Sequence, residues 1–221
     1  MVMRKTTKAA AVVATFVIFT AGFSTIAQAA PTKAPSKVNC KKTNAKGHSV
    51  KNITPPEVKT PFKNRTFTLN TNCGDIVIEA DGVKAPVTVI ALAALANGGF
   101  FNQTICHRLT TNNIYVLQCG DPTATGSGGP NFSYRDENLP QSVEANYPAG
   151  VVAMANSGAN TNGSQFFIVY EDTSLPPSYT IWGKVTKGLE IVQAIAKEGV
   201  INGKGDGLPK RTIAIEKVKV R

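Results

Sequence analysis

Short hydrophobic stretches recur along the chain from residue 66 onward, and turn-forming residues separate them. Val, Ile, Phe and Thr dominate these stretches, which is typical of strands. Pro86 in a first turn, apolar residues at helical spacing and Gly98 after the end predict a helix, and a second short helix is expected over 189–196. Many short strands with two helices indicate a mainly β barrel or sandwich with capped ends. The pattern predicts strands at 66–69, 75–79, 105–109, 114–118, 151–154, 166–169, 180–185 and 213–220.

The N-terminal pattern is that of an export signal. Arg4, Lys5 and Lys8 precede an apolar run over 9–23, and residues 27–29 have the small-x-small pattern of a signal-peptidase site. We therefore expect a signal peptide over 1–29 and a protein that is secreted or associated with the cell envelope. An uncleaved membrane anchor stays open, because ~20 apolar residues are enough to span a bilayer.

Residues 30–65 are rich in Lys, Pro and Thr and poor in large apolar side chains, so we expect a mobile linker before a folded domain at 66–221. The net charge of +10 belongs mostly to the N-terminal part, since residues 1–65 hold 12 of the 24 basic residues and one acid, Glu57. The nearly neutral domain argues against a nucleic-acid binder. The linker could associate weakly with an anionic cell wall or membrane surface, although a solvated spacer explains it equally well.

Several motifs that resemble catalytic or binding sites do not meet the requirements of those sites. The glycine-rich segments 126–129 and 203–207 lack the Lys-Ser/Thr of a phosphate loop and are interpreted as turns. Ser164 is outside a nucleophile elbow, and His107 is the only histidine in the predicted domain. The four cysteines show no CxxC spacing, so neither a metal nor a cofactor is expected.

Six motifs occur in a fixed order along the predicted domain: CHRL (106–109), LQCGD (117–121), GSGG (126–129), DEN (136–138), MANSGANTNGSQFFI (154–168) and WGKV (182–185). Together they resemble the cyclophilins, the peptidyl-prolyl cis-trans isomerases, especially their exported actinobacterial branch. The resemblance covers residues 66–221. It implies a closed eight-stranded antiparallel barrel capped by two helices, and an enzyme that assists folding of exported proteins by rotating Xaa-Pro bonds.

The resemblance also implies roles for individual residues. Arg108 stands in the catalytic arginine position, and Gln118 and Gln165 would orient it and bind the substrate carbonyl. The apolar slot for the proline ring aligns with Tyr115, Val116, Phe167 and Leu175, and Tyr115 is also placed among the catalytic residues. Ala155 and the backbone of Asn156 would bind the peptide as an added strand, and Tyr179 would contact it.

The chain departs from the family pattern around this slot. Two additional residues lie between Arg108 and Gln118, and Ser174 and Tyr179 stand where many members have Trp and His. Packing in the barrel core remains an alternative for Val116.

Two functions from different classes remain open. One is an isomerase, and the other is a proline-peptide binding or scaffolding module with little catalysis. Arg108 favours the isomerase, because binding alone needs no cation at the prolyl nitrogen. Proline-containing polypeptides are the expected partners, nucleic acid is not, and a monomer is expected.

An even number of cysteines in an exported chain suggests disulfides, with three pairings to choose from. One hypothesis pairs Cys106 with Cys119, which flank the hairpin of Arg108 and Gln118, and leaves Cys40 and Cys73 to pair or stay free.

Overall fold

The computed structural model describes residues 38–221. The predicted signal peptide (1–29) and the first residues of the predicted linker lie outside the described residues. The helices are α1 (Pro86–Asn97) and α2 (Leu189–Glu198). The strands are β1 (Arg65–Thr71), β2 (Gly74–Ala80), β3 (Thr104–Ile105), β4 (Arg108–Thr110), β5 (Val116–Cys119), β6 (Val151–Met154), β7 (Phe166–Val169), β8 (Ile181–Lys187), β9 (Asp206–Gly207) and β10 (Ala214–Val220).

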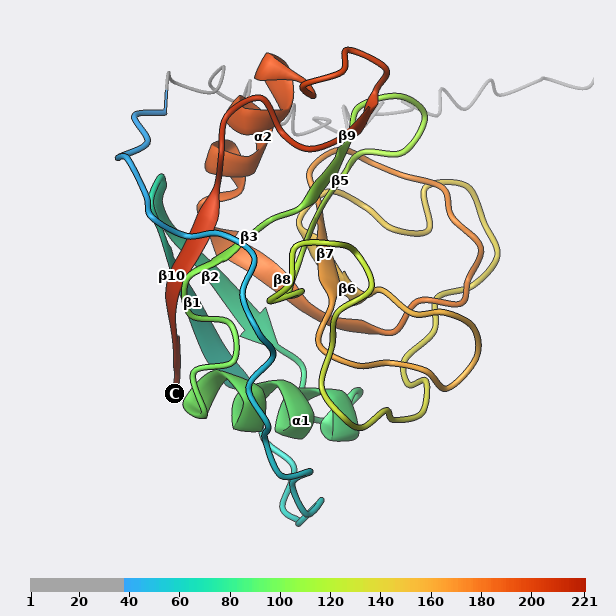
Figure 1. Cartoon of the computed structure of the whole chain (residues 1–221). Coiled ribbons are helices and arrows are strands. Elements are labelled where there is room, and N and C mark those ends of the chain that lie inside the picture. Colours follow the sequence, from blue (N-terminus) through green and yellow to red (C-terminus); the bar gives the residue numbers. More distant parts are fainter. Residues whose placement is uncertain (1–37) are drawn as a thin grey trace, which may run out of the picture. The chain divides into compact units, whose positions relative to one another are not determined.

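All these strands form one antiparallel sheet in the order β3-β10-β1-β2-β8-β6-β7-β5-β4-β9. Strand β3 lies at one edge and β4 next to the other, yet only Cys106 and His107 separate them along the chain. The sheet therefore has to curl back on itself into a barrel (Figure 1). The sequence prediction of eight strands becomes ten, because the stretch at 105–109 divides into β3 and β4, and the two-residue strand β9 was not predicted.

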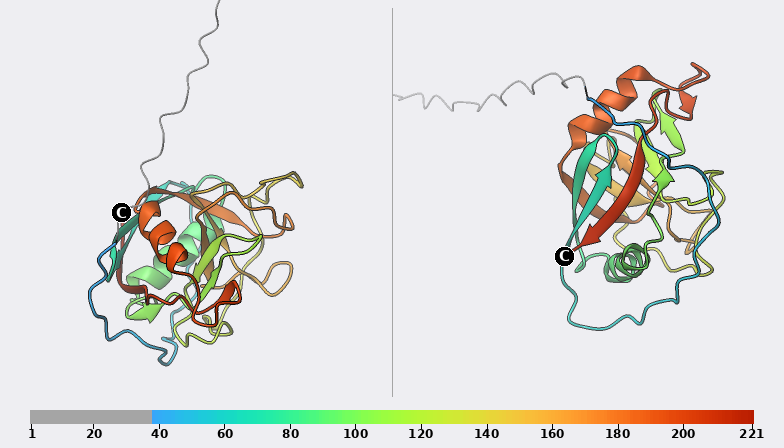
Figure 2. Two further views of the ribbon diagram at one scale, coloured as in Figure 1. Left: turned by 90° about the horizontal axis from the view of Figure 1, so that it is seen from above. Right: turned by 60° about the vertical axis from the view of Figure 1, so that its left-hand side comes forward.

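The main core fills the inside of the curled sheet. Trp182 on β8 is buried there, and its ring makes edge-to-face contacts with Phe67 at 5.4 Å and Phe166 at 5.8 Å. The two helices lie at opposite ends of the barrel (Figures 1 and 2). The fold is thus a mainly β barrel capped by two helices, as predicted.

Helix α1 is buried on most of its circumference, which an amphipathic surface helix would not be. One side packs on the barrel. The segment 38–64, which we call the strap, runs over the other side (Figure 1). Ile53 of the strap approaches Gly98 at the end of α1, and Pro61 and Phe62 line a small cavity together with Ile90. The apolar composition of α1 therefore reflects two packing partners.

The strap is fastened to the domain at several points. A disulfide joins Cys40 to Cys73, the backbone N–H of His48 donates to the carbonyl oxygen of Pro122 at 2.8 Å, and Asn131 Nδ2 donates to Asn52 Oδ1 at 2.9 Å. The prediction of a mobile linker is therefore wrong for residues 38–64. The crosslink and the hydrogen bonds offset an ordering entropy that this composition alone could not.

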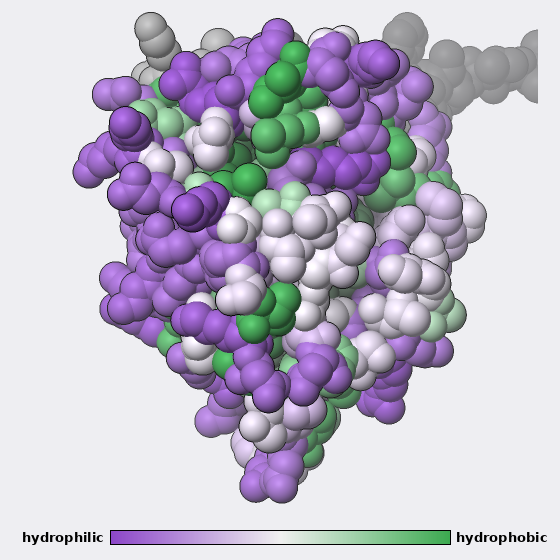
Figure 3. Space-filling view, in the orientation of Figure 1, coloured by the Kyte–Doolittle hydropathy of each residue, from purple (hydrophilic) through white to green (hydrophobic). Residues whose placement is uncertain are grey.

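The face shown in Figure 3 is mostly hydrophilic, with small separate hydrophobic patches. Large apolar side chains that are exposed, such as Val83 and Ile201, are scattered over the described surface. Within residues 38–221, no helix has both the length and the apolar character needed to cross a membrane.

Candidate active site

Arg108, Gln118 and Gln165 form a hydrogen-bonded row across three strands. Arg108 on β4 and Gln118 on β5 are direct cross-strand partners, so their side chains share one face of the sheet. Arg108 Nη1 donates to Gln118 Oε1 at 3.3 Å, and Gln118 Nε2 donates to Gln165 Oε1 at 2.8 Å. Gln165 Nε2 donates in turn to the carbonyl oxygens of Gly126 and Gly128, both at 2.9 Å. The structure thus brings these three predicted residues together.

A second apolar cluster lies on the same face, separate from the main core. Gln118 pairs with Phe167 on β7, and Phe167 pairs with Ala153 on β6, so this cluster continues the row of Arg108. Val116 belongs to this second cluster and not to the main core, and its side chain is buried there. The buried members are Val116, Tyr147, Ala153, Phe167 and Val169, and the predicted residues Ala155, Leu175 and Tyr179 pack against them.

Tyr147 holds Tyr179 over Phe167. The Tyr147 hydroxyl donates to the carbonyl oxygen of Tyr179 at 3.0 Å and accepts from its backbone N–H at 3.0 Å. The ring of Tyr179 meets that of Phe167 edge-to-face at 5.6 Å. Burial raises the pKa of Tyr147 to about 12, so its hydroxyl stays protonated and can donate. Sequence reasoning missed Tyr147, which lies in a loop outside the quoted motifs.

The structure does not bring Tyr115 to this cluster. Tyr115 directly precedes Val116, and adjacent residues in an extended strand point to opposite sides. Its ring packs against the main core and meets that of Tyr170 at 6.0 Å. The placement of Tyr115 in the slot beside Val116 is therefore not supported.

Ala155 and Asn156 line a cavity beside the hydrogen-bonded row of Arg108, Gln118 and Gln165. Gln118, Gln165 and the loop 126–130 line the same cavity. The N–H of Ala155 donates to the carbonyl oxygen of Gln165 at 2.9 Å, whereas the backbone of Asn156 makes no hydrogen bond to another described residue. An unpaired backbone at a cavity edge suits an added peptide strand.

The guanidinium of Arg108 has an acidic partner that sequence reasoning missed. Nε donates to Asp206 Oδ1 at 2.8 Å and Nη2 to Asp206 Oδ2 at 2.7 Å. This contact raises the pKa of Arg108, and the same guanidinium lowers the pKa of Asp206. Asp206 lies in the glycine-rich segment 203–207, whose interpretation as a turn gave no sign of this contact.

Asp121 organises the loop that supports Gln165. Its side chain is fully buried, and burial alone would oppose ionisation. Hydrogen bonds from the Thr123 hydroxyl and from the N–H groups of Gly128, Thr123 and Gly126 nevertheless lower its pKa. Asp121 thereby fixes the loop whose Gly126 and Gly128 carbonyl groups hold Gln165. The sequence motif included Asp121 without assigning it a role.

His107, next to Arg108, is not a second cation at neutral pH. Burial lowers its pKa and the positive charge of Arg108 acts in the same direction, and together they outweigh the opposing effect of the Asp121 carboxylate. A disulfide joins Cys106, just before β4, to Cys119 at the end of β5, which confirms the pairing predicted from sequence. The remaining pair, Cys40 and Cys73, is also joined.

Comparisons with known proteins agree with this geometry. The sequence model of the family described as cyclophilin type peptidyl-prolyl cis-trans isomerase/CLD matches residues 66–220. A probable peptidyl-prolyl cis-trans isomerase B from Mycobacterium leprae is 41% identical over 197 residues, which cover 83% of this chain and 67% of that protein. The Mycobacterium tuberculosis protein of the same name is 40% identical over 194 residues, covering 81% and 63%. The chain thus spans about two thirds of the length of these relatives.

A solved structure is also similar. The crystal structure of a cyclophilin type peptidyl-prolyl cis-trans isomerase from Cryptosporidium parvum superposes with a TM-score of 0.61 at 29% identity, covering 72% of this chain and 98% of that one. A second crystal structure of that protein, determined in the presence of the dipeptide Ala-Pro, gives a TM-score of 0.59.

Proposed function

Because this chain belongs to the cyclophilin-type peptidyl-prolyl cis-trans isomerases, we propose that it accelerates rotation about Xaa-Pro bonds in proteins that fold outside the cytoplasm. The observation that carries the proposal is the row of Arg108, Gln118 and Gln165 beside the apolar cluster of Phe167. A cation next to an apolar surface matches a prolyl residue, whose nitrogen can accept a hydrogen bond when the amide is twisted and whose ring carbons are apolar.

Arg108 supplies the chemistry that this reaction needs. Amide resonance opposes rotation with a barrier of ~18–20 kcal/mol, and twisting the bond localises a lone pair on the prolyl nitrogen. A fixed cationic donor at that nitrogen stabilises the twisted state more than either planar state, which is the condition for catalysis. The hydrogen bond to Gln118 holds the guanidinium in place for this role.

The apolar cluster would hold the proline ring while the other half of the amide rotates. Val116 and Phe167 are 3% and 5% exposed, so the ring would contact them from the edge near Leu175 and Tyr179, which are partly exposed. The backbone of Asn156 would pair with the peptide. The crystal structure of the Cryptosporidium relative in the presence of Ala-Pro is consistent with a site of this kind.

An extracytoplasmic location is supported by the cysteines and by the N-terminal sequence. All four cysteines form disulfides, which persist mainly in oxidising compartments. The signal peptide predicted over 1–29 lies outside the described residues and would direct the chain to export.

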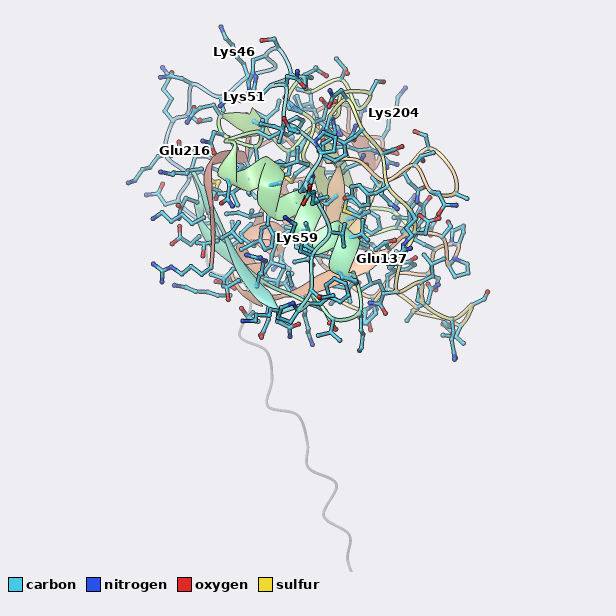
Figure 4. All side chains as sticks on the ribbon, turned by 90° about the horizontal axis from the view of Figure 1, so that it is seen from below. Lys46, Lys51, Lys59, Glu137, Lys204 and Glu216 are labelled. Carbon is cyan, nitrogen blue, oxygen red and sulfur yellow. A yellow bond between two sulfur atoms is a disulfide. The ribbon has the colours of Figure 1, made fainter. Side chains whose placement is uncertain are left out.

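The strap offers a second contact, with an anionic surface of the cell envelope. Lys46, Lys51 and Lys59 lie along it on the side shown in Figure 4, and their side chains are exposed. Each cation near an anionic membrane contributes about 1 kcal/mol. Cosedimentation with anionic vesicles that weakens as salt is raised would support this contact, and binding that is equal on neutral vesicles would contradict it.

Refolding experiments test the proposed function. An unfolded exported protein whose slow phase reflects prolyl isomerisation should refold faster with catalytic amounts of the chain. Acceleration only at stoichiometric amounts would indicate the alternative, a binding module with little catalysis.

A further inference from the structure

We propose that Asp206 is a positioning residue for catalysis, which holds the guanidinium of Arg108 in the orientation that presents its free N–H groups to the prolyl nitrogen. This inference rests on the proposed function. It assigns a role to the glycine-rich segment 203–207, which none of the motifs explains.

The donor count of Arg108 supports this role. A guanidinium has five N–H donors in a rigid plane. Asp206 takes one from Nε and one from Nη2, and Gln118 takes one from Nη1. The two remaining N–H groups, one on Nη1 and one on Nη2, have no hydrogen-bond partner among the described residues. With partners on Nε, Nη1 and Nη2, the plane of the guanidinium is fixed and two donors stay free for substrate.

Asp206 owes its own position to backbone contacts. Strand β9 pairs with β4, so that Thr110 lies opposite Asp206. The N–H of Thr111 donates to the carbonyl oxygen of Gly205 at 2.8 Å, and Asn202 Nδ2 donates to that of Asp206 at 3.1 Å. Gly205 has a φ of +83°, a conformation that suits glycine. Because backbone contacts fix the position of residue 206, substitutions of the Asp206 side chain should leave the segment 203–207 folded.

The ion pair between Arg108 and Asp206 could affect the orientation of the guanidinium, the stability of the fold and the charge of Arg108, and the effect on orientation is the largest. The side chains of Arg108 and Asp206 are 42% and 53% exposed, and exposed ion pairs contribute little to stability. Solvent also screens the partial neutralisation of Arg108 by the carboxylate. A misplacement of about 1 Å in a catalytic group, in contrast, can cost 100-fold in rate.

Kinetics of Asp206→Ala in the full chain, on a short Xaa-Pro peptide, test this role. We expect kcat to fall about 5- to 30-fold while KM changes less than about two-fold, because a guanidinium held by Gln118 alone spends more of its time in unproductive orientations. Asp206→Glu, which keeps the carboxylate, should recover part of kcat. Glu198→Ala is the matched control, because it also removes the acidic partner of an arginine, Arg211, but does not touch Arg108.

A double-mutant comparison separates positioning from a structural role. If Asp206 acts through Arg108, adding Asp206→Ala to Arg108→Ala should lower kcat no further. A further loss of similar size would overturn the inference, as would a single variant with kcat equal to or above that of the wild type. An inactive wild type would refute the proposed function and this inference with it, whereas an active wild type with an indifferent Asp206 refutes the inference alone.

Discussion

Replacing Asp121 with Asn tests whether the loop next to Gln165 depends on one buried carboxylate. Oδ2 accepts the N–H groups of Gly126 at 2.7 Å, Gly128 at 3.0 Å and Thr125 at 3.1 Å. Oδ1 accepts the N–H and the hydroxyl of Thr123, both at 2.7 Å. An asparagine keeps one oxygen, so its amide N–H₂ would face N–H donors in either orientation.

The expected cost follows from these contacts. Hydrogen bonds to a charged group contribute about 1.5–3 kcal/mol each, and a buried donor left without an acceptor costs about 1–3 kcal/mol. Partial relaxation of the loop would reduce that sum, so we expect Asp121→Asn to lower the free energy of unfolding by roughly 2–4 kcal/mol at pH 7. At about 2–4 °C per kcal/mol for a chain of this size, Tm should fall by roughly 4–16 °C.

The pH dependence provides a second measurement on the same variant. The folded-state pKa of Asp121 lies below its unfolded value, so its ionised form stabilises the fold above about pH 4. That contribution is lost as the pH falls through the folded-state pKa. The difference in unfolding free energy between wild type and Asp121→Asn should therefore shrink in acid.

Urea unfolding of the oxidised protein, followed by circular dichroism between pH 3 and pH 7 or so, measures both effects. The exposed Glu144 lies in the same β5–β6 connection, so Glu144→Gln removes a charge without a buried contact and should change little. A loss for Asp121→Asn no larger than that of Glu144→Gln, or one independent of pH, would refute the reasoning.

Two further variants test the start of α1 and the exposed residue Ser174. The carboxylate of Glu137 accepts the N–H groups of Val87 at 3.2 Å and Thr88 at 3.0 Å, and the labelled side chain lies near one end of α1 in Figure 4. Because α1 has no side-chain cap of its own, Glu137→Ala should cost about 1–2 kcal/mol in urea unfolding, and an unchanged midpoint would contradict this. The resemblance to the cyclophilins places Ser174, which is exposed, where many members have a Trp that would contact the inhibitor cyclosporin. We therefore expect poor inhibition by cyclosporin and a gain in its affinity of up to roughly 30- to 150-fold with Ser174→Trp. Inhibition of the native enzyme at nanomolar drug would contradict that expectation.

Elements with a clear periodicity could be predicted from sequence. Helix α1 begins at Pro86 and β7 begins at Phe166, as the pattern indicated. Residues 105–109 were predicted as one strand. A local pattern does not reveal that the chain passes at Cys106 and His107 from β3, at one edge of the sheet, to β4, which lies next to the other edge.

The errors in the candidate site have physical causes. Side chains alternate between the two faces of a strand, so Val116 lies on the same face as Gln118 and Tyr115 points to the opposite face. The alignment with the family did not show this, because two additional residues lie between Arg108 and Gln118. Asp206 lies 98 residues from Arg108, and only the register of β9 on β4 brings them together. The strap was judged by composition, which carries no information about a disulfide partner such as Cys73.

The central claim is that Arg108 stabilises the twisted prolyl amide, and the most direct test compares kcat/KM for Arg108→Ala and wild type on a short Xaa-Pro peptide. A transition-state hydrogen bond from a charged donor is typically worth ~1.5–3 kcal/mol, so kcat/KM should fall by a factor of about ten or more while the protein stays folded. Arg135→Ala, at an exposed arginine of the β5–β6 connection, is the matched control and should retain activity. A folded Arg108→Ala variant that isomerises the peptide at the wild-type rate would contradict the account.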